Sequence, residues 1–111
     1  MSGLLEILEK IRHRPGMYLG APSVSNLFMF LNGYEIARSE LNIELTKEEA
    51  AFHEEFQPWL QKKFGTSSSA SWAKLIMLRC SDEAAGLQYF FQLLDEFQQQ
   101  SQAIANQAVE V

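Results

Sequence analysis

Cysteine and histidine are scarce in this chain, and each shortage excludes a class of structure. The single cysteine, Cys80, excludes an internal disulfide, and its place in the apolar run LIMLRC is typical of a small buried residue. The two histidines, His13 and His53, lie far apart, and neither has a second histidine or a cysteine at metal-ligand spacing. His53 follows Glu49 by four residues, which predicts a side-chain pair on a helix surface. We therefore expect neither a metal site nor a cofactor.

Long apolar runs and positive charge are also scarce. No stretch approaches the roughly 20 apolar residues that a membrane-spanning helix needs. The first residues, MSGLLEILEKIR, have acids where a signal peptide would have its apolar core. The net charge of -5 opposes a general affinity for nucleic acid, which requires clustered Lys and Arg. We expect a cytoplasmic protein that binds neither membrane nor nucleic acid and that more readily meets a basic partner.

Apolar residues at helical spacing are abundant. A chain of 111 residues that is 47% hydrophobic has room for one domain with one core. The pattern predicts an all-α, single compact domain of four to six helices over residues 1–97. Residues 98–111 are predicted as a polar tail, either a fraying helix or a disordered segment. The expected core consists of Phe30, Tyr34, Phe56, Trp59, Trp72, Phe90, Phe91 and Leu94.

The first two helices are predicted on either side of a corner. Residues 2–12 should form an amphipathic helix that ends before Pro15, and Pro15 with Gly16 suits the central pair of a type II turn. Ser23 is a suitable cap for a second, central helix. Gly33 in its middle costs about 1 kcal/mol relative to alanine, which favours a close helix crossing over a functional contact. The apolar face of this helix is predicted to include Leu27, Phe28, Met29, Phe30, Leu31, Tyr34, Ile36 and Leu41.

The remaining helices have clear start and stop signals. Thr46 and Glu49 form a capping box, and Gly65 has the position of a helix C-cap. Pro58 between them predicts a kink or two consecutive helices. After the polar loop TSSSAS, residues 73–79 favour a helix, with a short buried strand as the alternative. Ser81 or Asp82 can cap a last helix, whose apolar stripe consists of Leu87, Phe90, Phe91, Leu94 and Phe97.

The segment KIRHRPGMYLG, residues 10–20, resembles the RxRPGMYIG segment near the start of the ATPase region of the DNA gyrase B subunit and its type II topoisomerase relatives. In that family a following helix has a glutamate that activates water and an asparagine that helps to hold the magnesium of ATP. Aligned on Leu27, this chain has Gly33 at the glutamate position and Ala37 at the asparagine position, and no Asp-x-Gly-x-Gly motif follows. The resemblance therefore transfers no catalytic residue and predicts no ATPase activity.

A second resemblance extends over more of the chain. The order RPGMYLG, FLNGYEIA, SSSASWAKLI and DEAAGLQYFFQLLDEF is similar to a class of small bacterial proteins, some of which are candidate immunity proteins encoded near toxins. It implies a non-enzymatic protein-binding domain without catalytic residues. A basic toxin would then meet an acidic surface, because opposite charge speeds association, although a solvated helix face is the alternative interpretation of these acids. The candidate partner-binding residues are Glu44, Glu48, Glu49, Glu54 and Glu55.

The alternative function is the binding of a small ligand or a nucleotide phosphate at the corner. Lys10, Arg12, His13 and Arg14 form a basic patch that suits a phosphate or a carboxylate, although cations at a helix C-terminus also stabilise the helix. The segment has neither the glycine spacing nor the lysine of a Walker phosphate-binding motif. Arg14 and Tyr18 should either contact the ligand or hold the corner against the first helix. The residues of this motif corner are Arg12, Arg14, Pro15, Gly16, Tyr18 and Gly20.

Overall fold

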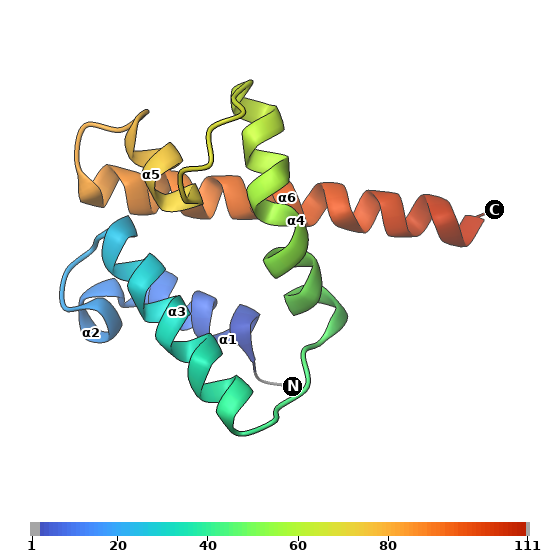
Figure 1. Ribbon diagram of the computed structural model, residues 1–111, viewed down its shortest axis with the longest axis horizontal. Coiled ribbons are helices and arrows are strands. Elements are labelled where there is room, and N and C mark those ends of the chain that lie inside the picture. Colours follow the sequence, from blue (N-terminus) through green and yellow to red (C-terminus); the bar gives the residue numbers. More distant parts are fainter. Residues whose placement is uncertain (1–2, 111) are drawn as a thin grey trace.

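Six helices and no strand form the part of the chain that the computed structural model describes, residues 3–110 (Figure 1). The predicted all-α fold is confirmed, and the alternative strand at residues 73–79 is wrong because this segment contains a short helix. Ser2 and Val111, the outer ends of the predicted first helix and tail, lie outside the described residues. The helices are α1 (Leu4–His13), α2 (Pro15–Leu19), α3 (Val24–Glu40), α4 (Lys47–Phe64), α5 (Trp72–Met77) and α6 (Glu83–Glu110).

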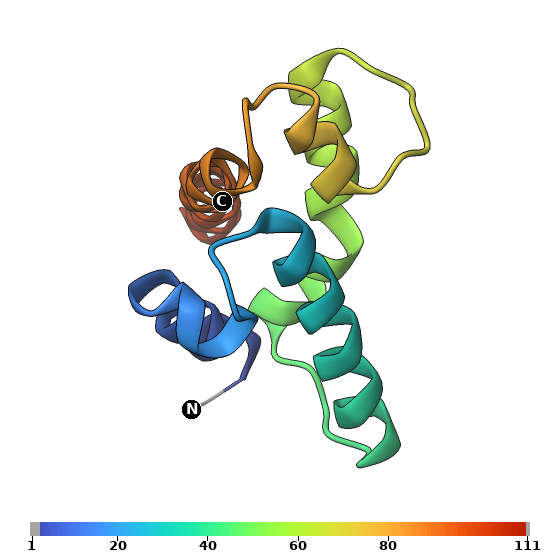
Figure 2. The ribbon, with the colours of Figure 1, turned by 90° about the vertical axis from the view of Figure 1, so that its left-hand side faces the viewer.

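The long helix α6 is the element around which the others are arranged. α3 and α5 both pack against it, and α5 also contacts α3. Figure 1 shows the C-terminal part of α6 extending beyond the other helices, and Figure 2 looks along α6 with α1 and α2 on one side and α4 and α5 on the other. The stretch expected as a polar tail continues α6 as far as Glu110.

Aromatic rings from α4, α5 and α6 form the centre of the core. The Phe56 ring lies 5.7 Å from Phe90 and 5.4 Å from Phe97, both edge to face, and Trp72 lies 4.9 Å from Phe90. Such pairs contribute about 0.5–1.5 kcal/mol beyond the area that they bury. Tyr34, predicted as a core residue, is only half-buried and stacks on Phe30 at the edge of the core. The predicted stripe of α6 is buried throughout: Leu87, Phe90, Phe91, Leu94 and Phe97.

Local capping signals are confirmed at four helix ends. Thr46 and Glu49 form both bonds of the capping box, and Gly65 ends α4 in the left-handed conformation at φ 65°. The Ser23 side chain accepts a hydrogen bond from the Asn26 N–H, and Asp82, rather than Ser81, accepts one from Ala85 N–H at 2.8 Å. These bonds satisfy N–H groups that have no partner inside their own helix. α4 runs through its internal proline as one helix, so the alternative of two helices is wrong.

The corner differs from the predicted type II turn. α1 ends at His13, and the break falls at Arg14, whose φ and ψ are -139° and 64°. Pro15 is the first residue of α2, a position that suits proline because the missing N–H has no partner there anyway. Among the described glycines only Gly20 and Gly65 have a φ in the left-handed range, so Gly16 does not have the conformation that a type II turn requires.

The close helix crossing predicted at Gly33 lies instead at another glycine. A Cβ atom added at Gly33 would meet no atom within 4 Å. A Cβ atom at Gly86 would lie 2.7 Å from Val24 Cγ1 and 2.9 Å from Met77 Sδ, closer than real Cβ contacts. Gly86 is therefore the residue that lets α6 approach α3 and α5, and Gly33 faces open space.

Candidate functional site

The five acidic residues predicted as a partner surface do not form one surface. Glu49 is only 1% exposed, so its prediction as a partner-facing residue is wrong, because it points into the molecule. Glu48 and Glu55 are exposed and lie seven residues apart, on the same side of α4. Glu54 is exposed about 100° around the helix from Glu55, and Glu44 lies in the loop before α4. The four exposed acids are thus spread over two sides of α4 and its preceding loop.

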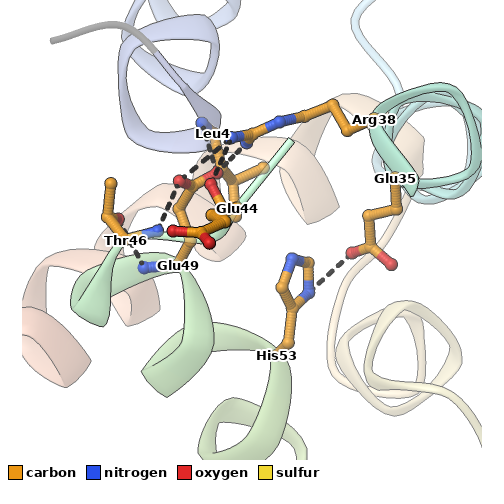
Figure 3. Close-up of polar contacts among 7 residues, drawn as sticks. All are labelled: Leu4, Glu35, Arg38, Glu44, Thr46, Glu49 and His53. Carbon is orange, nitrogen blue, oxygen red and sulfur yellow. Dashed lines mark hydrogen bonds and ion pairs between the residues drawn. The ribbon is translucent and has the colours of Figure 1, made fainter. Parts of the chain in front are cut away.

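Glu49 is a buried structural anchor. Its Oε2 accepts a hydrogen bond from Leu4 N–H at 3.1 Å, and its Oε1 accepts one from Thr46 N–H at 3.0 Å. The Arg38 guanidinium pairs with both carboxylate oxygens, as Figure 3 shows. A buried charge is tolerated when it is paired and hydrogen-bonded in this way. The capping box was evident in the sequence, whereas the contacts with Leu4 and Arg38 join residues 45 and 11 positions away and have no local signal.

His53 pairs with a residue of another helix. Its Nδ1 lies 2.6 Å from Glu35 Oε1 on α3 (Figure 3). The predicted pair with Glu49 is wrong because the Glu49 carboxylate is already bonded to Arg38 and two backbone amides. The contact therefore links α3 to α4 instead of lying along one helix surface.

Arg12, the corner arginine that belongs to α1, contacts α6. Arg12 Nη2 donates to Asp95 Oδ1 at 2.8 Å and to Phe91 O at 3.1 Å, and the guanidinium carbon lies 4.7 Å above the Phe91 ring. These contacts occupy the side chain that the ligand-binding alternative needs. Tyr18 is half-buried against the core, and the exposed Arg14 side chain forms no hydrogen bond or ion pair with any described residue. The Arg14 side chain therefore does not hold the corner against α1, and Arg12 attaches the corner to α6 instead.

Glu83 joins the start of α6 to the start of α3. Its Oε1 accepts from Ser23 Oγ at 3.0 Å and from Ser25 N–H at 2.9 Å, and its Oε2 accepts from Ser25 Oγ at 2.7 Å. The bonds from the Ser25 backbone and hydroxyl lower the pKa of Glu83, against a smaller opposing effect of burial. These bonds join residues 58 to 60 positions apart, so the sequence has no local signal for this contact between helices.

Cys80 is half-buried, as expected for a small apolar residue, and packs against the core. Burial raises the pKa of its thiol, and the negative charge of Asp82 raises it further. A thiol whose pKa is raised is mostly protonated at neutral pH and therefore a weak nucleophile.

Large apolar side chains are exposed on one side of α3. The exposed fractions are 67% for Met29, 64% for Ile36 and 70% for Leu41, whereas the prediction placed all three on the core-facing side. Met29 and Ile36 lie on one arc of α3 together with the exposed Gly33 and Ala37, and Leu41 is the C-cap residue that directly follows the helix. We call these five residues the outer α3 face. Figure 2 shows α3 at the margin of the molecule.

The opposite side of α3 explains why the prediction failed. Val24, Leu27 and Leu31 are buried there, so α3 has large apolar residues around most of its circumference and only one arc packs against the chain. A helix that is apolar on nearly all sides usually has a neighbour on each. The outer α3 face is therefore an apolar helix surface without an intramolecular neighbour among the described residues.

The surroundings of the outer α3 face are acidic and apolar. Glu40 and Glu44 are exposed near its C-terminal end. Between residues 24 and 46 the one basic residue is Arg38, whose side chain is 12% exposed and paired with Glu49. A pocket of about 340 Å³ lies at the same end of α3 but on its inner side, where Arg38, Ile43 and Leu45 are among the residues that line it. The face thus ends in a region of negative charge and further apolar side chains.

Comparisons of the chain with protein-family models, with curated proteins and with solved structures find no match. Within residues 3–110, no helix combines the length and the apolar character needed to cross a membrane. In the same part of the chain, no three His, Cys, Asp or Glu side chains are grouped as metal ligands would be. The outer α3 face is the observation that bears most directly on function.

Proposed function

We propose that this chain is a non-enzymatic, cytoplasmic protein-binding domain that contacts its partner through the outer α3 face. The observation that supports this proposal is the exposure of Met29, Ile36 and Leu41 on one side of one helix. Apolar surface gains about 25 cal/mol for each Å² removed from water. Contiguous apolar patches on folded proteins are accordingly typical of interaction sites. A partner that covers this side of α3 would remove all three side chains from water.

The charges beside the face favour a basic partner. Glu40 lies in the last turn of α3, where a negative charge is unfavourable because the helix C-terminus is itself partially negative. Glu44 adds a second negative charge in the loop that follows. Lys or Arg residues of a partner would pair with both acids at the rim of the contact, where such pairs contribute to specificity and to the association rate.

A basic bacterial toxin is the partner that agrees with the resemblance to immunity proteins. On this proposal the chain neutralises the toxin by covering part of its surface. Glu48, Glu54 and Glu55 are exposed on α4 and would add to the negative field that attracts the toxin. They need not touch the partner, because long-range attraction acts over about 10 Å at 0.1 M salt.

The experiment that tests the surface is a calorimetric titration of the chain with the protein encoded by the adjoining gene. Ile36→Asp places a charge inside the outer α3 face and should weaken binding at least about tenfold, which corresponds to the loss of one well-buried contact. Leu78→Asp is the matched control, since Leu78 is 81% exposed but lies outside this face. Equal affinity of the wild type and Ile36→Asp, or no binding by the wild type, would contradict the proposal.

Immunity is tested by survival of cells that express the adjoining gene. Co-expression of the wild-type chain and of Leu78→Asp should protect the cells, and Ile36→Asp should not. Death in the presence of the wild type refutes the immunity role, whereas protection by Ile36→Asp refutes the outer α3 face as the contact.

A further inference from the structure

Gly33 is a residue that the folded chain by itself does not explain. It lies in the middle of α3, where glycine weakens a helix relative to alanine. A Cβ atom at this position would meet nothing within 4 Å, so no contact within the described part of the chain requires a glycine. At Gly86, by contrast, a Cβ atom would collide with Val24 and Met77. The described fold therefore gives no reason for a glycine at position 33.

The neighbours of Gly33 have the arrangement of a helix-packing surface. Ala37 lies one turn further along α3 and is exposed, so two small residues follow each other on the same side. Met29 and Ile36 lie beside them as larger exposed apolar side chains. Packed helices approach to about 8–10 Å between their axes, and the smallest separations require small residues at the point of contact. The outer α3 face thus offers two small residues, with larger apolar side chains beside them, to a second helix.

Charge decides which helix would fit. Glu40 and Glu44 carry negative charge near one end of the outer α3 face, and Arg38 is paired with Glu49. The outer α3 face of a second copy of this chain would supply the same acids and no available base. We infer that the partner element is an amphipathic helix with Lys or Arg beside its apolar stripe, and that it crosses α3 at Gly33. This inference rests on the proposed function of the face and adds the type of element and the sign of its charge.

The test uses a synthetic helical peptide as the probe. The peptide has about 18 residues, or five helical turns, with Leu at positions i, i+3, i+4 and i+7 and Lys at the other positions. A second peptide has Glu in place of Lys. Fluorescence anisotropy should show binding of the Leu–Lys peptide to the wild-type chain and no binding of the Leu–Glu peptide. Equal binding of both peptides would overturn the assigned charge, and failure of both to bind would overturn the helical partner.

Substitutions at Gly33 separate the inference from the proposed function. Gly33→Ala should raise the melting temperature of the chain, because alanine favours helix. The same substitution should weaken binding of the Leu–Lys peptide about tenfold. Gly33→Leu, with a larger side chain at the crossing, should abolish binding. Ile36→Asp should weaken binding at least about tenfold, and Leu78→Asp should leave it unchanged.

Each result has one interpretation. If the Gly33 variants bind the peptide as well as the wild type while Ile36→Asp does not, the crossing at Gly33 is refuted and the docking face stands. If Ile36→Asp binds like the wild type, the docking face itself is refuted. Analytical ultracentrifugation of the chain alone should show a monomer, and a dimer dissociated by Ile36→Asp would overturn the inference by identifying a second copy as the occupant.

Discussion

At the scale of single residues, Glu49 is the buried charge to which three helices are bonded. Its two carboxylate oxygens receive hydrogen bonds from α1, from the start of α4 and from Arg38 on α3. Gly3 packs so closely that a Cβ atom there would lie 3.1 Å from Glu49 Oε1. Three helices are therefore joined at one buried charge, and the stability of the fold should depend on it.

We predict that Glu49→Gln lowers the free energy of unfolding by about 3–5 kcal/mol, the usual cost of breaking a buried ion pair by removing one partner. The variant leaves the Arg38 guanidinium buried without its counter-charge. Glu48→Gln, next in the chain but exposed, is the matched control and should change stability by less than about 0.5 kcal/mol. Urea denaturation of both variants measures the difference, and similar losses from the two would contradict a special role for Glu49.

Gly33 in α3 and Gly86 in α6 should respond to alanine with stability changes of opposite sign. Gly33→Ala should stabilise the chain by about 1 kcal/mol, since the new methyl group meets no atom and alanine favours helix. Gly86→Ala should destabilise it, because the methyl group would collide with Val24 and Met77 and force α6 away from α3 and α5. Thermal unfolding of the pair measures both. A loss of stability in Gly33→Ala would mean that this face is covered within the chain.

At the scale of elements, the parts that could be predicted were those that depend on neighbours in sequence. The capping box at Thr46, the left-handed Gly65 and the cap at Ser23 each involve residues within three or four positions, so their patterns are local. The stripe of α6 was predictable because its other side is polar, which leaves one choice of buried face.

The orientation of α3 could not be predicted, for a physical reason. Its buried arc contains Leu27 and Leu31, and its exposed arc contains Met29 and Ile36, so the apolar period does not distinguish the two. Only tertiary packing decides which arc faces the core. The same holds for the partners of Glu49, which are distant in sequence. The exposed side of an all-round apolar helix is nevertheless a signal that sequence reasoning can use, because it indicates a second neighbour.

The junction between α3 and α6 gives a prediction of pH dependence. Bonds from Ser25 hold the pKa of Glu83 below its usual value of about 4.3. A lowered folded-state pKa means that the carboxylate stabilises the fold above the unfolded pKa, and that this contribution is lost as the pH falls through the folded pKa. Glu83→Gln should therefore lower the free energy of unfolding by about 1 kcal/mol at pH 7. The difference in unfolding free energy between this variant and the wild type should become smaller below about pH 4.

Urea denaturation at a series of pH values measures this dependence. Glu54→Gln is a suitable control because Glu54 is exposed. A difference between Glu83→Gln and the wild type that stays constant from neutral to acid pH would show that the carboxylate charge is not what joins α6 to α3.

At the scale of the whole molecule, binding would use two separate properties of the chain. The outer α3 face supplies apolar contact area, whereas the net charge of -5 supplies a field that extends beyond the contact. Exposed acids on α4, such as Glu54 and Glu55, contribute to this negative field. The two properties act on different steps, since long-range charge changes the rate of encounter and buried contacts change the rate of dissociation.

This division predicts different kinetics for two sets of variants. Each Glu→Lys exchange removes a negative charge and adds a positive one, so Glu54→Lys with Glu55→Lys raises the formal net charge from -5 to -1. Measured by stopped flow with the Leu–Lys peptide, the double variant should associate more slowly at low salt and dissociate at the wild-type rate. Ile36→Asp should instead dissociate faster.

Raising the salt to about 1 M reduces the screening length to about 3 Å, and the wild type should then associate as slowly as the double variant. Faster dissociation of the double variant would place Glu54 and Glu55 inside the contact, next to the partner.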